Sequence, residues 1–170
     1  MRLPTTLTIT DDSGFLAIVN PDRYHSFVDS EWELTELFSR FVDEMNQGNL
    51  IIWATGYEND WNVIFLNRPS NETSFREFST TIEVTNGKLF LTNYEDLTMA
   101  AQVQDEKLPS RHNADLCLNL DNGKYEFTIR QLFDPEDYNY VAHQKINFEI
   151  IIRPDSERQP KIDRVFWWTE

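Results

Sequence analysis

The chain has 170 residues, of which 29 are Asp or Glu and 15 are Lys or Arg, so its formal net charge is -14. Excess charge of one sign repels itself and does not stabilise a fold, but it steers oppositely charged partners. The charge therefore suits a basic partner and argues against nucleic acid or an anionic membrane as a direct ligand, with high solubility as the alternative explanation.

Length and apolar content predict a single domain over residues 1–170. Hydrophobic residues make up 40% and aromatic residues 14% of the chain, too many for a disordered acidic protein. One cysteine, Cys117, excludes an internal disulfide and favours a reducing compartment. The first ten residues do not resemble a signal peptide, and no apolar run is long enough to span a membrane. We expect a cytoplasmic protein of undetermined oligomeric state.

The first predicted element is a β-hairpin. Residues 7–10 alternate between apolar and polar, and residues 15–19 form a continuous apolar stretch. Between them lies Asp11-Asp12-Ser13-Gly14, a composition typical of turns. The two stretches are therefore expected to pair.

The clearest helix is predicted at about residues 31–47. Ser30 and Glu33 have the spacing of a capping box, in which each side chain accepts a hydrogen bond from a free backbone N–H at the helix start. Apolar residues then recur at helical spacing over residues 34–45, and Gly48 ends the helix.

The rest of the chain is predicted to be mainly strand. Asn86-Gly87 and Asn122-Gly123 each separate two strand-like stretches, and such pairs are typical of tight hairpins. Residues 94–113 have a weak pattern with one helical turn at 97–102, and residues 165–168 are expected to dock as a last strand or clamp. The expected strands are 7–10, 15–19, 50–54, 61–66, 75–84, 88–92, 116–120, 125–130 and 145–152. The predicted fold is mainly β (α+β), an antiparallel β-sandwich of about nine strands with one amphipathic helix packed on it.

No motif in the chain indicates catalysis or metal binding. The three histidines and the cysteine are isolated in the sequence, without metal-ligand spacing: His25, His112, His143 and Cys117. Cys117 lies in an apolar stretch, which favours a buried thiol, although a cysteine–histidine dyad formed in space stays open. Carboxylate pairs are too frequent in so acidic a chain to indicate a glycosidase, and no glycine-rich phosphate loop is present. We expect no metal, no cofactor and no enzymatic activity.

The predicted helix offers a candidate partner-binding surface. At about 100° per residue, four acids fall opposite the apolar stripe, with Trp32 at the edge of that face: Glu33, Glu36, Asp43 and Glu44. Negative charge near a helix C-terminus costs roughly 0.3–1 kcal/mol, so Asp43 and Glu44 suggest a functional role. The face is predicted to bind a protein with Trp32 as the aromatic anchor, and a merely solvated face is the alternative.

Two further clusters combine acids with aromatic residues. One contains Tyr57, Glu58 and Asp60 beside Trp61. The other is a predicted loop whose candidate binding residues are Asp134, Glu136, Asp137, Tyr138 and Tyr140. Aromatic anchors with an acidic rim are typical of interfaces, while an acidic turn between strands is the alternative for the loop.

Two stretches resemble a known family. The first runs from Phe75-Arg76-Glu77-Phe78 through Ile82-Glu83-Val84 and Asn86-Gly87 to Leu89-Phe90-Leu91, and the second joins Asp121-Asn122-Gly123-Lys124-Tyr125 to Asp134-Pro135-Glu136. They are similar to a strand pair and a later hairpin of the competence protein J-like nuclease inhibitors and related immunity proteins of bacterial toxin systems. The resemblance does not cover the predicted helix, and it assigns no functional residue. It implies an acidic, β-rich protein that binds and silences a toxin, often a nuclease.

The sequence thus predicts an acidic cytosolic inhibitor or immunity protein that neutralises a basic toxin, with a nuclease as one candidate. The alternative is a ligand- or carbohydrate-binding β-sandwich, which an exposed Trp53 or Trp61 on a concave strand face would favour. The third hypothesis is an enzyme of unrecognised type.

Overall fold

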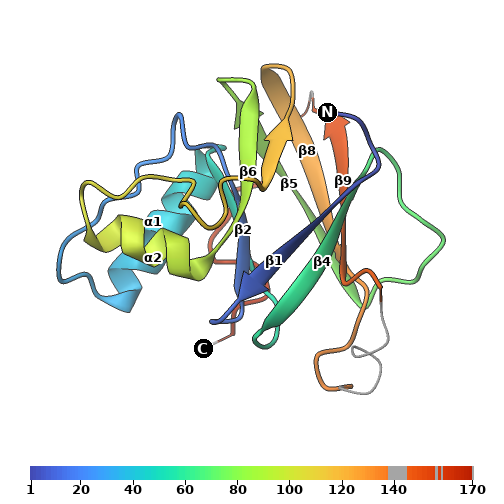
Figure 1. Cartoon of the computed structure of the whole chain (residues 1–170), viewed down its shortest axis with the longest axis horizontal. Coiled ribbons are helices and arrows are strands. Elements are labelled where there is room, and N and C mark those ends of the chain that lie inside the picture. Colours follow the sequence, from blue (N-terminus) through green and yellow to red (C-terminus); the bar gives the residue numbers. More distant parts are fainter. Residues whose placement is uncertain (138–144, 156, 158, 170) are drawn as a thin grey trace.

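The computed structural model describes residues 1–137, 145–155, 157 and 159–169, and this part of the chain forms two β-sheets and two helices (Figure 1). One sheet has five strands in the order β1-β4-β9-β8-β5: Thr5–Asp11, Asn59–Leu66, Phe148–Pro154, Gly123–Gln131 and Arg76–Val84. The other has four strands in the order β3-β2-β6-β7: Leu50–Ala54, Phe15–Val19, Lys88–Asn93 and Cys117–Asn119. The helices are α1 (Leu34–Asn46) and α2 (Tyr94–Gln102).

The predicted mainly β, α+β class and the nine strands are confirmed, but the expectation of one helix is wrong. Residues 94–102 form a complete helix where the sequence indicated a single turn. Its start is fixed by Asn93, whose side chain accepts a hydrogen bond from the Asp96 backbone N–H at 3.0 Å. The apolar pattern of α2 is weak because few of its side chains are buried, among them Leu97, Ala100 and Ala101.

The four-stranded sheet is covered on both faces. Along β2, Leu16 and Ile18 join the cluster shared with the five-stranded sheet, whereas Phe15, Ala17 and Val19 join the cluster that includes residues of α1 and α2. Both helices lie on the outer side of this sheet (Figure 1). Coverage on both faces explains why β2 and β3 are continuous apolar runs rather than alternating ones.

The three predicted hairpins are wrong, although the turns themselves are present. In each case the strands before and after the turn belong to different sheets: β1 and β2, β5 and β6, and β7 and β8. Gly87 has φ +70°, but Trp167 is the one non-glycine residue with positive φ among those described. Asn86 therefore lacks the positive φ that a type I′ turn requires at both central positions. Gly87 instead lies where the chain crosses from the five-stranded sheet to the four-stranded sheet.

One strand pair departs from the expected antiparallel arrangement. β4 and β9 are parallel, with Val63 opposite Phe148 and Leu66 opposite Ile151. The other paired strands in the described chain are antiparallel.

The C-terminal residues dock as expected and act as a clamp. The Ala54 backbone N–H donates to the Phe166 carbonyl at 2.9 Å, and Phe166 stacks on Phe78 with ring centroids 3.7 Å apart. Val165 is buried in the cluster beneath the helices. The clamp therefore contacts both hydrophobic clusters.

The cap of α1 differs from the predicted one. Glu33 is the N-cap, and its backbone N–H donates to the Glu36 carboxylate at 3.3 Å. The Ser30 hydroxyl instead donates to Asp29 at 3.3 Å. The capping box is thus formed by Glu33 and Glu36, three residues later than expected.

Candidate functional site: an acidic and apolar surface on the helices

Exposed apolar side chains gather on the helical side of the molecule. Six large hydrophobic residues among those described are exposed, and four of them belong to this layer: Phe27, Leu34, Met99 and Val103. Their exposed fractions range from 38% to 51%. Single exposed apolar residues are ordinary, but several in one region are characteristic of an interaction surface.

Backbone hydrogen bonds bring these residues near one another. The N–H groups of Val28 and Asp29 both donate to the Ala101 carbonyl, at 2.8 and 3.2 Å. The chain before α1 therefore lies along the C-terminal end of α2, which places Phe27 near the turn that carries Met99 and Val103. Leu34 is the first residue of α1, which begins shortly after Asp29.

Carboxylates border these apolar residues. The exposed acids of the two segments are Asp29, Glu31, Glu33, Glu36, Asp105 and Glu106. None of them forms an ion pair with another described residue. We call these six acids together with Phe27, Leu34, Met99 and Val103 the helical-layer surface. An apolar centre with a charged rim is the arrangement of a protein interface.

Only part of the predicted helix face belongs to this surface. Glu33 and Glu36 lie on it, whereas Trp32 is half-buried against the cluster beneath the helices, where it is not a free anchor. Asp43 is exposed but lies near the other end of α1, at a groove of about 690 Å³ that Lys124 and Lys161 also line.

The prediction that Glu44 is exposed is wrong. Its side chain is 2% exposed and accepts a hydrogen bond from the Asn49 amide at 2.8 Å. His25 Nδ1 lies 3.6 Å from the same carboxylate. The Asn49 amide satisfies this buried carboxylate, so Glu44 has a local structural role.

Tyr24 is buried beside this carboxylate. Its hydroxyl makes no hydrogen bond to any described residue. Burial raises the Tyr24 pKa far above its ordinary value, the Glu44 charge raises it further, and the Arg40 charge acts in the opposite direction. Tyr24 therefore stays neutral in the folded protein.

The two other predicted clusters meet at one end of the molecule. Gly56 has φ +106°, and a Cβ atom there would come within 2.6 Å of Pro135. This contact, which only glycine permits, places Tyr57 and Glu58 next to Asp134 and Glu136. The remaining candidates here, Asp60 and Asp137, are both exposed, and Asp60 accepts a hydrogen bond from the Thr10 hydroxyl at 2.6 Å. Tyr138 and Tyr140 lie outside the described residues. We call this region the loop end.

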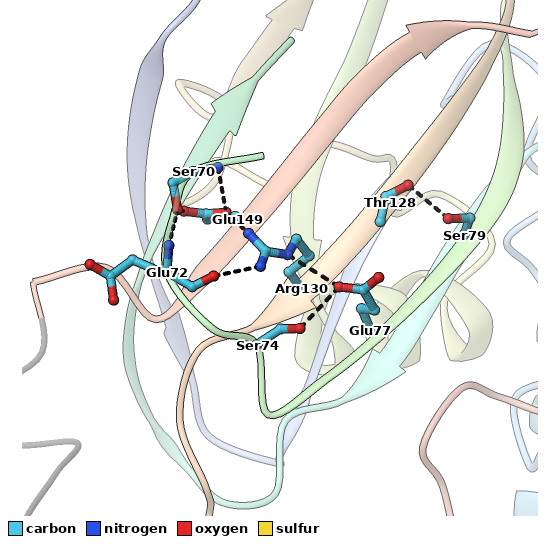
Figure 2. A network of polar contacts seen from close by, with 8 residues as sticks. All are labelled: Ser70, Glu72, Ser74, Glu77, Ser79, Thr128, Arg130 and Glu149. Carbon is cyan, nitrogen blue, oxygen red and sulfur yellow. Dashed lines mark hydrogen bonds and ion pairs between the residues drawn. The ribbon is translucent and has the colours of Figure 1, made fainter. Parts of the chain in front are cut away.

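A polar network that the sequence did not indicate lies on the outer face of the five-stranded sheet (Figure 2). Arg130 pairs with Glu149 and, at 3.2 Å, with Glu77, and it also donates to the Glu72 carbonyl at 2.6 Å. Ser70 hydrogen-bonds to Glu149. Arg130 is 8% exposed and Glu149 3% exposed. The network attaches the connection between β4 and β5 to the sheet, since Ser70 and Glu72 belong to it.

Arg130 follows the buried Ile129 along β8 and is buried as well, although neighbouring residues of a strand point to opposite faces. Its burial arises because the β4–β5 connection folds over the sheet, and no local pattern shows that. Arg130, Glu77 and Glu149 each have a partner within the protein, so the network has a structural role.

The features expected of a sugar site or a metal site are not found in the described chain. Trp53 and Trp61 are both fully buried, and the Trp61 indole donates to Asp11 at 2.9 Å, so neither ring can stack on a sugar. The described residues include no group of three or more His, Cys, Asp or Glu placed to hold a metal ion. Neither described helix has the length and apolar character needed to cross a bilayer.

Comparison with known proteins returns structures but no sequence relatives. No family model and no curated protein matches the chain. A solved structure titled "Crocagin biosynthetic gene J" is 11% identical, with a TM-score of 0.56 over 90% of this chain and 97% of that chain. ComJ from Bacillus subtilis, an inhibitor of the DNA degrading activity of NucA, is 11% identical, with a TM-score of 0.47 over 87% of this chain and 92% of that chain. At 11% identity, the likeness to the first of these structures concerns the fold alone.

Proposed function

We propose that this protein is an inhibitor that binds a basic protein partner through the helical-layer surface. One observation carries the proposal: four exposed apolar side chains lie among six exposed carboxylates that have no ion pairs with described residues. Apolar contacts at the centre would supply affinity, and the carboxylates would accelerate association and select a basic partner. The net charge of -14 extends this attraction beyond the surface itself.

A nuclease is the first partner class to test. A nuclease binds phosphates with a basic groove, and a carboxylate surface competes for the same groove by the same electrostatics. The resemblance of two stretches of the sequence to nuclease inhibitors and immunity proteins leads to the same partner class. The inhibitor would then act by covering the groove, which requires no catalytic residue of its own.

The test uses the protein's own cellular partner. Tagged protein is used to isolate proteins from the source cell at low salt, and each isolated basic protein is purified and assayed for nuclease activity with and without the inhibitor. The double variant Leu34→Ser and Met99→Ser should bind the partner at least about tenfold more weakly, because both side chains are expected to be buried in the complex. The same variant should inhibit the nuclease correspondingly less.

Phe75→Ser is the matched control, because Phe75 is 50% exposed but precedes β5, far from the helices in the chain. It should bind as tightly as the wild type. If the double variant binds as well as this control, the helical-layer surface is not the interface. If no basic protein is bound at all, the proposed function is wrong.

A further inference from the structure

A separate cleft of about 520 Å³ lies at the loop end. Its walls come from the turn after β1, the turn after β3 and the C-terminal clamp. Four aromatic residues and one carboxylate dominate the lining: Phe15, Tyr57, Trp167, Trp168 and Glu58. No lysine or arginine is among the lining residues of the described chain. The cleft therefore combines aromatic faces with a negative charge, the two features that attract a cation.

The aromatic walls of the cleft are held by their surroundings. The Trp168 ring lies 5.3 Å from Phe15 and 5.4 Å from Phe38. Trp167 has φ 63°, a strained conformation for a bulky residue. Such conformations persist only where neighbouring contacts enforce them, and they cluster at binding sites. Trp167 is accordingly in contact with Phe78, at 4.9 Å between ring centroids.

One cation, Arg76, lies close to the cleft without lining it. Its guanidinium is 4.2 Å from the centroid of the Trp167 ring, and it donates to Gln131 at 2.8 Å and to the Ala54 carbonyl at 3.2 Å. Its charge is therefore already engaged by these partners.

A second carboxylate lies beside the cleft. The lining residue Ser13 donates its hydroxyl to Glu95 Oε1, while Glu95 Oε2 is buried without a hydrogen-bond partner among the described residues. The surroundings of the cleft thus contain two carboxylates, Glu58 and Glu95, and one guanidinium, Arg76, which already has hydrogen-bond partners. Negative charge is therefore in excess.

We propose that this cleft binds an arginine side chain of the basic partner. A guanidinium is planar, so it stacks on an indole or phenol ring while it forms a two-pronged hydrogen bond with a carboxylate such as Glu58. The proposal deepens the proposed function by naming a side chain of the partner, and it rests on that function for the partner itself. Binding of the isolated side chain is measurable without the partner.

The experiment follows the five indole N–H signals of the protein by NMR during titration with N-acetyl-arginine amide. The signals of Trp167 and Trp168 should shift, while those of the buried Trp53 and Trp61 should stay in place. N-acetyl-citrulline amide is the matched control ligand, because it has nearly the same shape without the charge. It should bind roughly tenfold more weakly.

Two exposed acids provide matched variants for the same titration. Glu58→Gln should weaken arginine binding roughly two- to fivefold, since an exposed ion pair contributes modestly. Glu136→Gln removes an acid of the loop end that does not line the cleft, so it should change nothing.

Equal binding of the arginine and citrulline ligands would overturn the proposal, as would shifts of Trp167 and Trp168 with methyl glucoside alone, or no shift with any ligand. The outcome is independent of the Leu34 and Met99 variants. If the arginine titration fails but the Leu34 and Met99 double variant loses the partner, the cleft is not an arginine site. The helical-layer surface then remains the proposed interface.

Discussion

Two acidic regions of this molecule use their carboxylates in opposite ways. On the outer face of the five-stranded sheet, Glu77 and Glu149 flank Arg130, and neighbouring serine and backbone groups complete the network. On the helical-layer surface, six exposed carboxylates have no ion pair with described residues and lie beside exposed apolar side chains. Carboxylates alone therefore do not identify a binding site in an acidic protein. Carboxylates without an internal ion pair, next to exposed apolar side chains, are more informative.

The comparison predicts that changes in the network reduce stability, whereas changes in the helical-layer surface reduce binding. The largest effect is expected for Arg130→Met, which leaves Glu149 buried without a counter-charge. Such a change typically costs about 3–5 kcal/mol. Urea unfolding at neutral pH measures the loss. Glu77→Gln is the control: this side chain is 53% exposed, so its replacement should cost less than about 1 kcal/mol. Similar stabilities for Arg130→Met and wild type would show that the network is not structural.

A second structural test concerns the crossover between β5 and β6. Gly87→Val places a β-branched residue at φ +70° and should destabilise the protein by about 1–3 kcal/mol. Gly87→Asn is the control, since asparagine tolerates positive φ and should retain most of the stability. The midpoint of thermal unfolding reports both. If the valine variant melts as the wild type does, the backbone at this crossover is not strained by a side chain.

The Tyr24 hydroxyl is buried beneath the helices and has no hydrogen-bond partner among the described residues. It differs in this from the charged groups around Arg130 on the five-stranded sheet, which are paired. Tyr24→Phe removes this hydroxyl and should leave stability at neutral pH equal or increase it by up to about 1 kcal/mol. Because burial raises the Tyr24 pKa above its unfolded value of 10.0, wild-type stability is retained below that pH and falls as the unfolded chain ionises above it.

The phenylalanine variant lacks this ionisable group, so its advantage over the wild type should grow above about pH 10. Denaturant unfolding at pH 8 and pH 10.5 provides the comparison. A constant difference between the two proteins across this range would contradict the raised pKa.

The smallest effect on stability is expected on the helical-layer surface. Asp105→Asn with Glu106→Gln should change the free energy of unfolding by less than about 0.5 kcal/mol, because both side chains are exposed and unpaired among the described residues. The same variant should associate with the partner more slowly at low salt, and the difference should shrink as salt rises and screening shortens to about 8 Å. Stopped-flow mixing measures both rates. Equal rates at low salt would mean that these acids do not steer association.

The sequence by itself determined most of the local structure. β3 begins and ends at the predicted residues, α1 covers most of its predicted range, and the turns at Gly14 and Gly87 exist, because periodicity and glycine geometry are properties of neighbouring residues. The charge and the acidic positions 33 and 36 on the helical-layer surface were also visible in the sequence.

Only the tertiary structure decided which strands pair and which acids lack an ion pair. A turn signal does not specify whether the next strand stays in the same sheet, and here three turns lead to the other sheet. The burial of Glu44 depends on Asn49 and His25, and the meeting of Tyr57 with Asp134 depends on the contact between Gly56 and Pro135. Burial and pairing are set by contacts between residues far apart in the chain, and helical or strand periodicity contains no information about those contacts.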